Sequence, residues 1–204
     1  MEYYELHPET PQQRYINKAV EVLRDGGVIV YPTDTVYGFG CDIFNHDAVK
    51  RIYDIKLESG TKLFSFIIPD LKDIAQYAKV SDYAYKMMKK HLPGPYTFVL
   101  PASKEVPKKL WTKRKTVGIR VPDHYVAQLL AKELGHPILS TSVTTRKGEN
   151  LYDPEEIKSM YNPYVDLMLA DGALNGKPSS IIDLSGDEVQ ILREGAGDVS
   201  LFVY

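Results

Sequence analysis

The sequence has little of the chemistry that metals and disulfides require. Its 204 residues include a single cysteine, Cys41, and five histidines scattered along the chain. One cysteine cannot form an internal disulfide, and no cysteine or histidine stands at the spacing of a zinc site. We therefore expect no metal held by the protein. We interpret Cys41 as a small buried apolar residue and the histidines as ordinary core or surface residues.

Long apolar runs are also absent. No stretch approaches the roughly 20 apolar residues that span a bilayer. The first ten residues, MEYYELHPET, have neither the basic nor the apolar region of a signal peptide. The composition, with 44% hydrophobic and 25% charged residues, is typical of a soluble globular protein. These observations favour a cytoplasmic protein without a membrane partner.

Neither a strong excess of one charge nor a common phosphate-binding motif is present. The formal net charge of −2 argues against a protein that coats nucleic acid by bulk electrostatics, although a local basic groove remains compatible with it. No Walker A sequence and no GxSxG elbow occur, and Gly38-Phe39-Gly40 continues as Cys-Asp-Ile rather than as GxGxxG. A bound nucleotide would have to be held by less common means.

What is present is an alternation of helical and strand patterns. Helical spacing of apolar residues predicts helices that begin at Thr10, Asn45 and Asp153, helices near residues 71–78 and 82–91, and a helix over 126–134. Short apolar runs predict strands at residues 28–31, 63–68, 95–101, 116–122, 137–142, 179–184 and 189–194. No linker and no repeat interrupts this order. The chain is therefore predicted to be a single α/β domain, residues 1–204 with a core at about 12–198, on a twisted, mostly mixed sheet flanked by helices.

The expected helix starts rest on capping residues. Thr10 precedes Pro11, and Gln13 follows Thr10 by three residues, which is the pattern of a capping box with proline at the first helical position. Asn45 and Ser81 are the expected caps of the next two long helices. Asp153 opens a helix with acidic residues in its first turn.

Hydroxyl side chains and isolated cations gather at the predicted strand ends. The hydroxyls are Thr33, Thr35, Ser140, Thr141, Ser142, Thr144, Thr145, Ser179 and Ser180, and the cations are Lys56, Lys62, Arg120 and Arg193. Ligands of open α/β sheets bind beyond strand ends, where short hydroxyls let an anion approach the backbone and cations neutralise it. This pattern predicts a pocket for an anion.

Each of these residues also has an ordinary structural interpretation. A single serine or threonine after a strand usually forms a turn or caps a helix, and Lys56 at a helix end is typical of a solvated C-terminal cation. Arg120 is different, because a cation inside a short apolar strand needs a partner. Asp34 and Tyr37 fit turn and packing roles equally well.

Several motifs, taken together and in order, resemble one known family. They are GGVIVYPTDTVYGFGCD, IYDIK, LPGPYTFVLP, TVGIRVPDH, PILSTS, GKPSSIIDL and ILREGAGD. In this order they are similar to the YrdC/YciO domain family across nearly the whole chain. The segments HPETPQQRYINKAV and KRKTVGIRVP resemble the YciO branch in particular.

The resemblance implies a single YrdC-like domain with a large basic concave cavity. In the YrdC branch such a domain makes L-threonylcarbamoyl-AMP and pyrophosphate from threonine, bicarbonate and ATP, for the t6A modification of tRNA. The family is also described as binding double-stranded RNA and tRNA. Mg²⁺ is expected to accompany the ATP and to be held mainly by phosphate oxygens.

Carried over by motif, the resemblance assigns roles to individual residues. Thr33, Arg120, Ser140 and Ser179 would bind threonine, with Arg120 on its carboxylate. Lys56, Lys62, Ser142, Thr144 and Arg193 would bind the nucleotide. Of these, Lys56, Arg120 and Ser142 are the expected catalytic residues. Gly38 and Gly40 would let the backbone turn tightly beneath the cavity.

Two positions depart from the synthase branch, whose signature reads K-x-R and S-x-N. Here Lys56 is followed two residues later by Glu58, and Ser142 by Thr144. At Glu58, an anion in place of a phosphate-facing cation reverses a Coulomb energy of roughly 4 kcal/mol per charge pair at 4 Å and an effective dielectric constant near 20. At Thr144, a hydroxyl replaces an asparagine amide, which can donate and accept at once. Two functions therefore stay open. One is a threonylcarbamoyl-AMP synthase or a weakened form of one, and the other is an RNA- or nucleotide-binding protein that uses the same cavity without efficient turnover.

Overall fold

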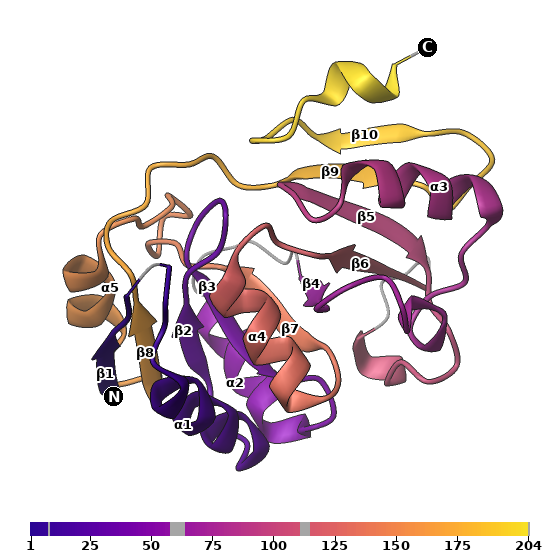
Figure 1. Ribbon diagram of the computed structural model, residues 1–204. Coiled ribbons are helices and arrows are strands. Elements are labelled where there is room, and N and C mark those ends of the chain that lie inside the picture. Colours follow the sequence, from indigo (N-terminus) through magenta and orange to yellow (C-terminus); the bar gives the residue numbers. More distant parts are fainter. Residues whose placement is uncertain (8, 58–63, 111–114, 204) are drawn as a thin grey trace.

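The computed structural model describes residues 1–7, 9–57, 64–110 and 115–203 (Figure 1). Within them, ten strands form one sheet in the order β1-β8-β2-β3-β7-β4-β6-β5-β9-β10. The strands are β1 Glu2–Glu5, β2 Ile29–Tyr31, β3 Gly38–Asp42, β4 Ser65–Ile67, β5 Tyr96–Pro101, β6 Thr116–Arg120, β7 Ile138–Ser142, β8 Leu167–Ala170, β9 Ser180–Asp183 and β10 Gln190–Arg193. Parallel and antiparallel pairs both occur, so the sheet is mixed, as predicted.

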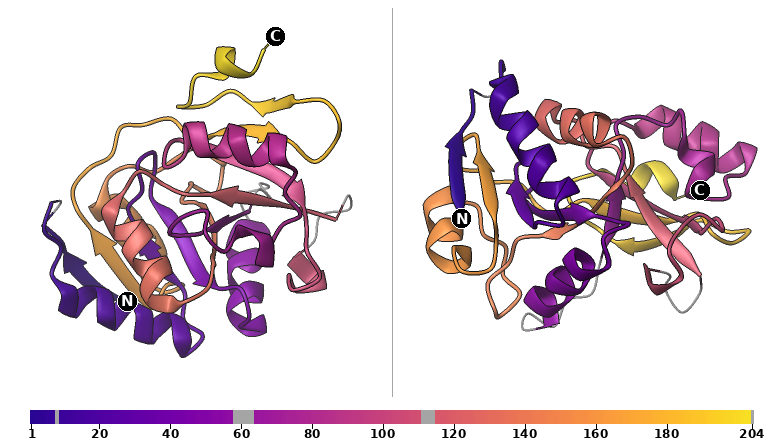
Figure 2. Two further views of the ribbon diagram at one scale, coloured as in Figure 1. Left: turned by 45° about the vertical axis from the view of Figure 1, so that its right-hand side comes forward. Right: turned by 90° about the horizontal axis from the view of Figure 1, so that it is seen from below.

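Helices cover both faces of the sheet (Figures 1 and 2). The α-helices are α1 Gln13–Arg24, α2 His46–Leu57, α3 Asp82–His91, α4 Tyr125–Leu134 and α5 Pro154–Tyr161, and the 3₁₀ helices are η1 Ile74–Gln76, η2 Lys108–Leu110 and η3 Val199–Phe202. Successive residues of a strand point to opposite faces. Ile29 of β2 accordingly packs with α1 and α4, whereas Val30 packs in the second core, with α2, α3 and α5.

The sheet register brings the polar strand ends together at the centre of the molecule. Gly38 of β3 pairs with Ser142 of β7, and Gly40 pairs with Ser140. On its other side, β7 pairs with β4, where Ser140 lies opposite Ser65. Segments that are distant in the sequence therefore meet on the middle strands.

The start of the first helix was predicted wrongly. Helix α1 begins at Gln13 after the N-cap residue Gln12, and no side chain caps it. Thr10 instead contacts the Nδ1 of His7, and the Gln13 side chain donates to Asn17. The other expected caps are confirmed, since Asn45 accepts from Ala48 N, Ser81 from Ala84 N and Asp153 from Glu155 N.

Some element predictions also need correction. The helix expected near residues 71–78 is only the short η1, and β1 and β8 were not predicted as strands. Strand β1 lies at the edge of the sheet and pairs only with β8. Its sequence, Glu-Tyr-Tyr-Glu, lacks the alternation of apolar and polar residues that would have predicted a strand. The remaining predicted helices and strands are confirmed with shifted ends.

The stretch after β2 does not form the tight glycine turn that its sequence suggests. Gly38 and Gly40 instead lie inside strand β3. A Cβ at Gly38 would stand 2.9 Å from the Ser140 Oγ, and one at Gly40 would stand 2.8 Å from the Tyr31 ring. These glycines are needed because neighbouring side chains occupy the space where a Cβ would be.

Within the described residues, every helix falls short of the length and apolar character that crossing a bilayer requires.

Candidate functional site

A polar cavity of about 170 Å³ opens where the middle strands end. Its walls come from the β2–β3 loop, the end of α2, strands β4 to β7 and the start of β9 and end of β10. The polar side chains that line it are Thr33, Tyr37, Lys56, Ser65, Thr97, Arg120, Ser140, Thr141, Ser142, Thr144, Asn150, Ser179 and Arg193. Among the described lining residues there are three cations and no acidic side chain, so the cavity suits an anionic ligand.

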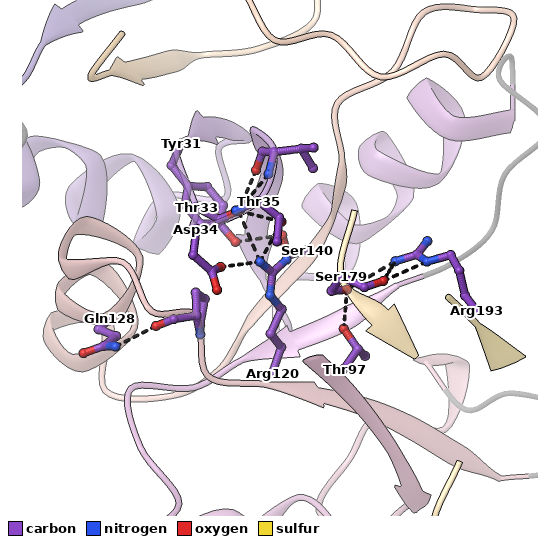
Figure 3. A network of polar contacts seen from close by, with 12 residues as sticks. Tyr31, Thr33, Asp34, Thr35, Thr97, Arg120, Gln128, Ser140, Ser179 and Arg193 are labelled. Atoms are coloured by element: carbon purple, nitrogen blue, oxygen red, sulfur yellow. Dashed lines mark hydrogen bonds and ion pairs between the residues drawn. The ribbon is translucent and has the colours of Figure 1, made fainter. Parts of the chain in front are cut away.

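Arg120 lies at one end of the cavity, at the last position of β6 (Figure 3). Its Nη2 donates to Asp34 Oδ1 at 2.5 Å, to Thr35 Oγ1 at 2.8 Å and to Thr33 Oγ1 at 3.3 Å. The predicted need for a partner is confirmed, since Asp34 forms a buried ion pair with this guanidinium. Asp34 is thereby more than a turn residue, because its carboxylate fixes the position of Arg120.

The Thr33 hydroxyl is also part of the turn after β2. It donates to the carbonyl of Val36 at 2.6 Å and accepts from the backbone N–H groups of Thr35 and Val36. The ordinary interpretation of this residue as a turn former therefore holds. Because Thr33 also lines the cavity and contacts Arg120, the same turn holds the arginine beside the ligand space.

Lys56 is not the solvated helix-end cation that its position suggests. It is only 2% exposed, and its Nζ donates to Thr144 Oγ1 at 2.8 Å and to the carbonyl of Ser142 at 3.1 Å. Burial lowers the pKa of its ammonium to about 8. The Tyr161 hydroxyl donates to the carbonyl of Thr144, so α5 supports the residue that holds Lys56.

Arg193 and Ser179 form the opposite wall of the cavity (Figure 3). The Nε and Nη2 of Arg193 donate to the carbonyl of Ser179 at 2.9 and 2.7 Å, and Nη2 also donates to the Ser179 hydroxyl at 3.2 Å. Burial and, secondarily, the charge of Arg120 lower the pKa of Arg193. The two arginines are thus close enough to repel each other, which a bound anion would relieve.

Two features of the cavity wall were not predicted from the sequence: Thr97 as a lining residue, and the hydrogen-bond partner of Ser140. Thr97 lies within β5, and its hydroxyl meets that of Ser179 at 2.8 Å. The Tyr31 hydroxyl donates to Ser140 Oγ at 2.7 Å, and burial raises the pKa of Tyr31. A polar residue inside an otherwise apolar strand was the available signal for Thr97.

A second polar cluster holds the β2–β3 loop from outside. The Tyr37 hydroxyl donates to the carbonyl of Gly172 at 2.6 Å, and His124 Nε2 contacts Asp171 Oδ2 at 2.9 Å. The cluster therefore connects the loop that carries Thr33 to the end of β8 and the start of α4.

The expected nucleotide contact Lys62 and the departure at Glu58 lie outside the described residues. The other predicted site residues all line the one cavity. Within the described part of the chain, no three His, Cys, Asp or Glu residues group as metal ligands. The hydroxyls and cations of the cavity do not fit a Mg²⁺ ion held by the protein itself.

The chain is similar to known proteins along nearly its whole length. The family model of Sua5, YciO and YrdC, described as "Telomere recombination", matches residues 21–195. The chain is 45% identical to YciO of Escherichia coli (strain K12) over 99% of both chains, and the crystal structure of E. coli YciO superposes with a TM-score of 0.94 over 100% of both.

Of two further relatives, one is named for an activity and the other was solved with a ligand. The threonylcarbamoyl-AMP synthase of Coxiella burnetii (strain RSA 493) is 36% identical over 85% of this chain and 95% of its own. The structure of P. abyssi Sua5 complexed with L-threonine has a TM-score of 0.87 and 26% identity, and it covers 96% of this chain and 58% of its own. The protein therefore belongs to the Sua5/YciO/YrdC family.

Proposed function

We propose that the protein is a threonylcarbamoyl-AMP synthase-like enzyme that uses threonine, bicarbonate and ATP. The observation that carries the proposal is that Lys56, Arg120 and Arg193 line one cavity together with many hydroxyl groups. None of the described residues that line this cavity is acidic. A relative at 36% identity is named for this activity, and a structural relative is complexed with L-threonine.

The two ends of the cavity suit the two substrates. Arg120, with Thr33 and Ser140 nearby, provides the cation and hydroxyls for an amino acid carboxylate and side chain. Lys56 and Arg193 provide cations for phosphates, with Ser142 and Thr144 beside the lysine. Mg²⁺ would arrive with ATP, bound to phosphate oxygens, and would neutralise part of their charge.

The reaction needs placement and charge neutralisation rather than a covalent side-chain nucleophile. The threonine amine and bicarbonate first give a carbamate and water. A carbamate oxygen then attacks the α-phosphorus of ATP, the bond from this phosphorus to the bridging oxygen breaks, and pyrophosphate leaves. Arg120 would hold the threonine carboxylate and so orient the carbamate, while Lys56 would stabilise the charge that develops on the phosphates.

Thr144 bears on how fast this reaction runs. Its Oγ1 accepts a hydrogen bond of 2.8 Å from Lys56 Nζ. The side-chain oxygen of an asparagine at this position would be able to accept the same bond. An asparagine amide would in addition offer an N–H donor to the ligand. This favours, as a second function, nucleotide or RNA binding in the same cavity without efficient turnover.

Pyrophosphate release measures the proposed reaction directly. The protein is incubated with threonine, bicarbonate, ATP and Mg²⁺, and Lys56→Ala serves as the inactive control. Release that requires threonine and exceeds this control supports the proposal. Release at the level of Lys56→Ala contradicts it, and ATP binding without release would then identify the second function.

The double variant Glu58→Arg with Thr144→Asn restores the synthase signature. If these two positions limit the reaction, the rate of pyrophosphate release should rise by at least about tenfold, which corresponds to roughly 1.4 kcal/mol of activation free energy. An unchanged rate would show that the signature does not limit turnover. Thr145→Asn, a neighbouring exchange at a residue that does not line the cavity, is the matched control.

A further inference from the structure

A second pocket, of about 240 Å³, lies between the C-terminal half of α2 and the end of α5. The first cavity, which contains Lys56 and Arg120, has a volume of about 170 Å³, and none of its described lining residues also lines the second pocket. The second pocket is therefore a separate space, and the proposed reaction gives it no role.

Helix α2 forms one wall of the second pocket. Arg51, Asp54 and Ile55 line it, and spacings of three and four residues place their side chains on one face of the helix. Arg51 is held in place, because its Nη1 pairs with Asp166 Oδ2 at 2.9 Å and its Nη2 donates to the carbonyl of Tyr164 at 3.2 Å. Asp54 has no ion-pair partner within the described residues. This wall therefore presents a fixed cation and a carboxylate that a ligand can reach.

A second wall is apolar and comes from the end of α5 and the residues that follow it. Met160, Tyr161, Pro163 and Tyr164 line the pocket there. The rings of Tyr161 and Tyr164 meet edge to face, with their centroids 6.5 Å apart. Such rings pack well against a further ring or a large aliphatic group. Met160 and Tyr164 are exposed, so the pocket opens to solvent.

The charges of the second pocket differ from those of the first cavity. The described residues that line the first cavity include three cations and no acid, which suits a ligand that is anionic throughout. The second pocket combines Arg51 and Arg146, which belongs to the loop between β7 and α5, with the carboxylate of Asp54. Because this carboxylate repels a phosphate, a ligand with one anionic and one cationic group matches the pocket better.

We propose that the second pocket binds a free α-amino acid with a large apolar side chain. The carboxylate of the amino acid pairs with Arg146, and its ammonium group pairs with Asp54. The side chain packs against Met160 and Tyr164, which supply the apolar surface. Each of the three parts of the ligand thus has its own complement in the pocket.

Tyr161 connects the second pocket to the first cavity. Its ring lines the second pocket, and its hydroxyl donates to the carbonyl of Thr144. Thr144 lines the first cavity, where its Oγ1 accepts from Lys56 Nζ at 2.8 Å. The β7–α5 loop is shared in the same way, since Gly148 lines the first cavity and Arg146 lines the second pocket. An amino acid in the second pocket therefore acts on the surroundings of Lys56 without entering the first cavity.

Isothermal titration calorimetry with L-phenylalanine tests the site. For a ligand of this size we expect a Kd on the order of 1 mM or below. 3-Phenylpropionate lacks the ammonium group and phenethylamine lacks the carboxylate, so each should bind about tenfold more weakly or worse. L-Alanine, which lacks the ring, should also bind more weakly. Absence of saturable L-phenylalanine binding up to about 10 mM, or equal affinity for all four probes, would overturn the proposal.

Two pairs of variants locate the site. Asp54→Asn and Arg146→Gln should each weaken L-phenylalanine binding by about tenfold or more, since each removes one charged partner of the ligand. Asp47→Asn on the same helix and Lys147→Gln on the same loop are the matched controls, because neither residue lines the second pocket. The Kd should be unchanged in both controls. Equal losses in the controls and in the pocket variants would overturn the assignment.

Arg120→Met separates this site from the first cavity. If L-phenylalanine bound in the first cavity, in place of the proposed threonine, its affinity would fall in Arg120→Met and stay the same in Asp54→Asn, and the inference would be wrong. We expect the opposite pattern. Ser179→Ala is a milder change in the first cavity and should likewise leave L-phenylalanine binding intact. Thermal unfolding followed by circular dichroism establishes that each variant is folded. Calorimetry needs neither ATP nor turnover, so the result does not depend on whether pyrophosphate is released.

Tyr161→Phe tests the connection, because it keeps the ring in the second pocket and removes the bond to Thr144. Lysine labelled with ¹³C at Cε gives an NMR resonance for Lys56, which is assigned by its loss in Lys56→Arg. Saturating L-phenylalanine should shift this resonance in the original protein but not in Tyr161→Phe, although Tyr161→Phe still binds the amino acid. A resonance that stays in place in the original protein would overturn the connection. Equal shifts in both proteins would show that it does not pass through the Tyr161 hydroxyl.

Discussion

Two buried cations of the cavity are held by different elements. Arg120 shares an ion pair with Asp34 of the β2–β3 loop, and Lys56 donates to oxygens of Ser142 and Thr144 at the end of β7. Burial disfavours the ammonium, which is why the pKa of Lys56 falls to about 8. The charge of the proposed phosphate site is therefore sensitive to pH near neutrality, while the partner of Arg120 keeps that guanidinium in place.

Nucleotide binding should take up protons above about pH 8. Free Lys56 is increasingly neutral there, and a triphosphate favours its charged form, so ATP affinity should fall as the pH rises through 8. Calorimetry in buffers of different ionisation enthalpy measures the proton uptake. Lys56→Arg should bind without it between pH 8 and 9, and the same uptake in that variant would assign the proton to another group.

The pKa of Lys56 also affects stability without ligand. The unfolded chain binds this proton up to about pH 10.5, whereas the folded chain loses it near pH 8. The free energy of unfolding contributed by Lys56 should therefore rise between these two pH values.

Asp34→Asn should destabilise the fold and loosen Arg120. The variant keeps an acceptor but removes the charge opposite a buried guanidinium, so the free energy of unfolding should fall by about 1–3 kcal/mol. Asp34→Ala, which removes the acceptor as well, should cost about 3–5 kcal/mol. Urea unfolding measures both.

A double-mutant cycle with Arg120→Met tests the Asp34 assignment. If the two side chains act as a pair, the double variant loses less than the sum of the single variants. Strict additivity would mean that Asp34 acts through the turn rather than through Arg120.

At the scale of elements, the middle of the sheet depends on glycine in β3. The Tyr31 ring of β2 and the Ile138 side chain of β7 occupy the space beside Gly40, within 2.9 Å of where a Cβ would stand. Because Tyr31 also donates to Ser140, a shift of this ring would disturb the cavity wall. Packing of β3 and the geometry of the site are therefore linked.

Gly40→Ala should lower the free energy of unfolding by about 1–3 kcal/mol, since the added methyl overpacks a buried strand. Gly186→Ala is the matched control, because a Cβ there has no neighbour within 4 Å and the expected change is less than about 0.5 kcal/mol. Chemical denaturation of both variants provides the comparison. Equal stability of the two would show that the strand adjusts at no cost.

Local sequence patterns predicted much of this element structure but not all of it. Ser81 and Asp153 precede apolar periodic runs, and their capping bonds form as expected. Thr10 carries the same local signal, yet α1 starts later. The glycines of β3 read as a turn, because the side chains that exclude a Cβ come from β2 and β7 and are invisible to a local pattern.

The candidate site was predictable as a set of residue types but not as a set of contacts. Strand-end hydroxyls and cations indicated an anion pocket, and Arg120, a cation inside an apolar strand, was expected to need a polar partner. The identity of that partner, Asp34, and the burial of Lys56 depend on how β6, α2 and β7 meet in the folded sheet. These contacts join residues that are distant in the sequence, so local sequence patterns cannot predict them.

At the scale of the whole molecule, the basic segment 72–115 should dominate binding to polyanions, since its formal charge is +8 and that of the remaining residues is −10. Despite a sequence pI near 6.2 and a net charge of −2, the protein should be retained on immobilised heparin at pH 7.5. A variant with Lys86→Gln, Lys89→Gln and Lys90→Gln in α3 should elute at clearly lower salt than a control with Lys18→Gln, Lys50→Gln and Lys158→Gln. Co-elution of all three proteins would contradict a localised surface.

The strand order has a consequence for how the protein folds. Strands β2 and β8, and β5 and β9, are neighbours in the sheet although much of the chain separates them. Such non-local pairing raises contact order and slows folding. Since Thr33 and Arg193 face one cavity from near the two ends of the chain, ligand binding should appear only at the last kinetic step of refolding. A proteolytic fragment without either end should not bind ligand at all.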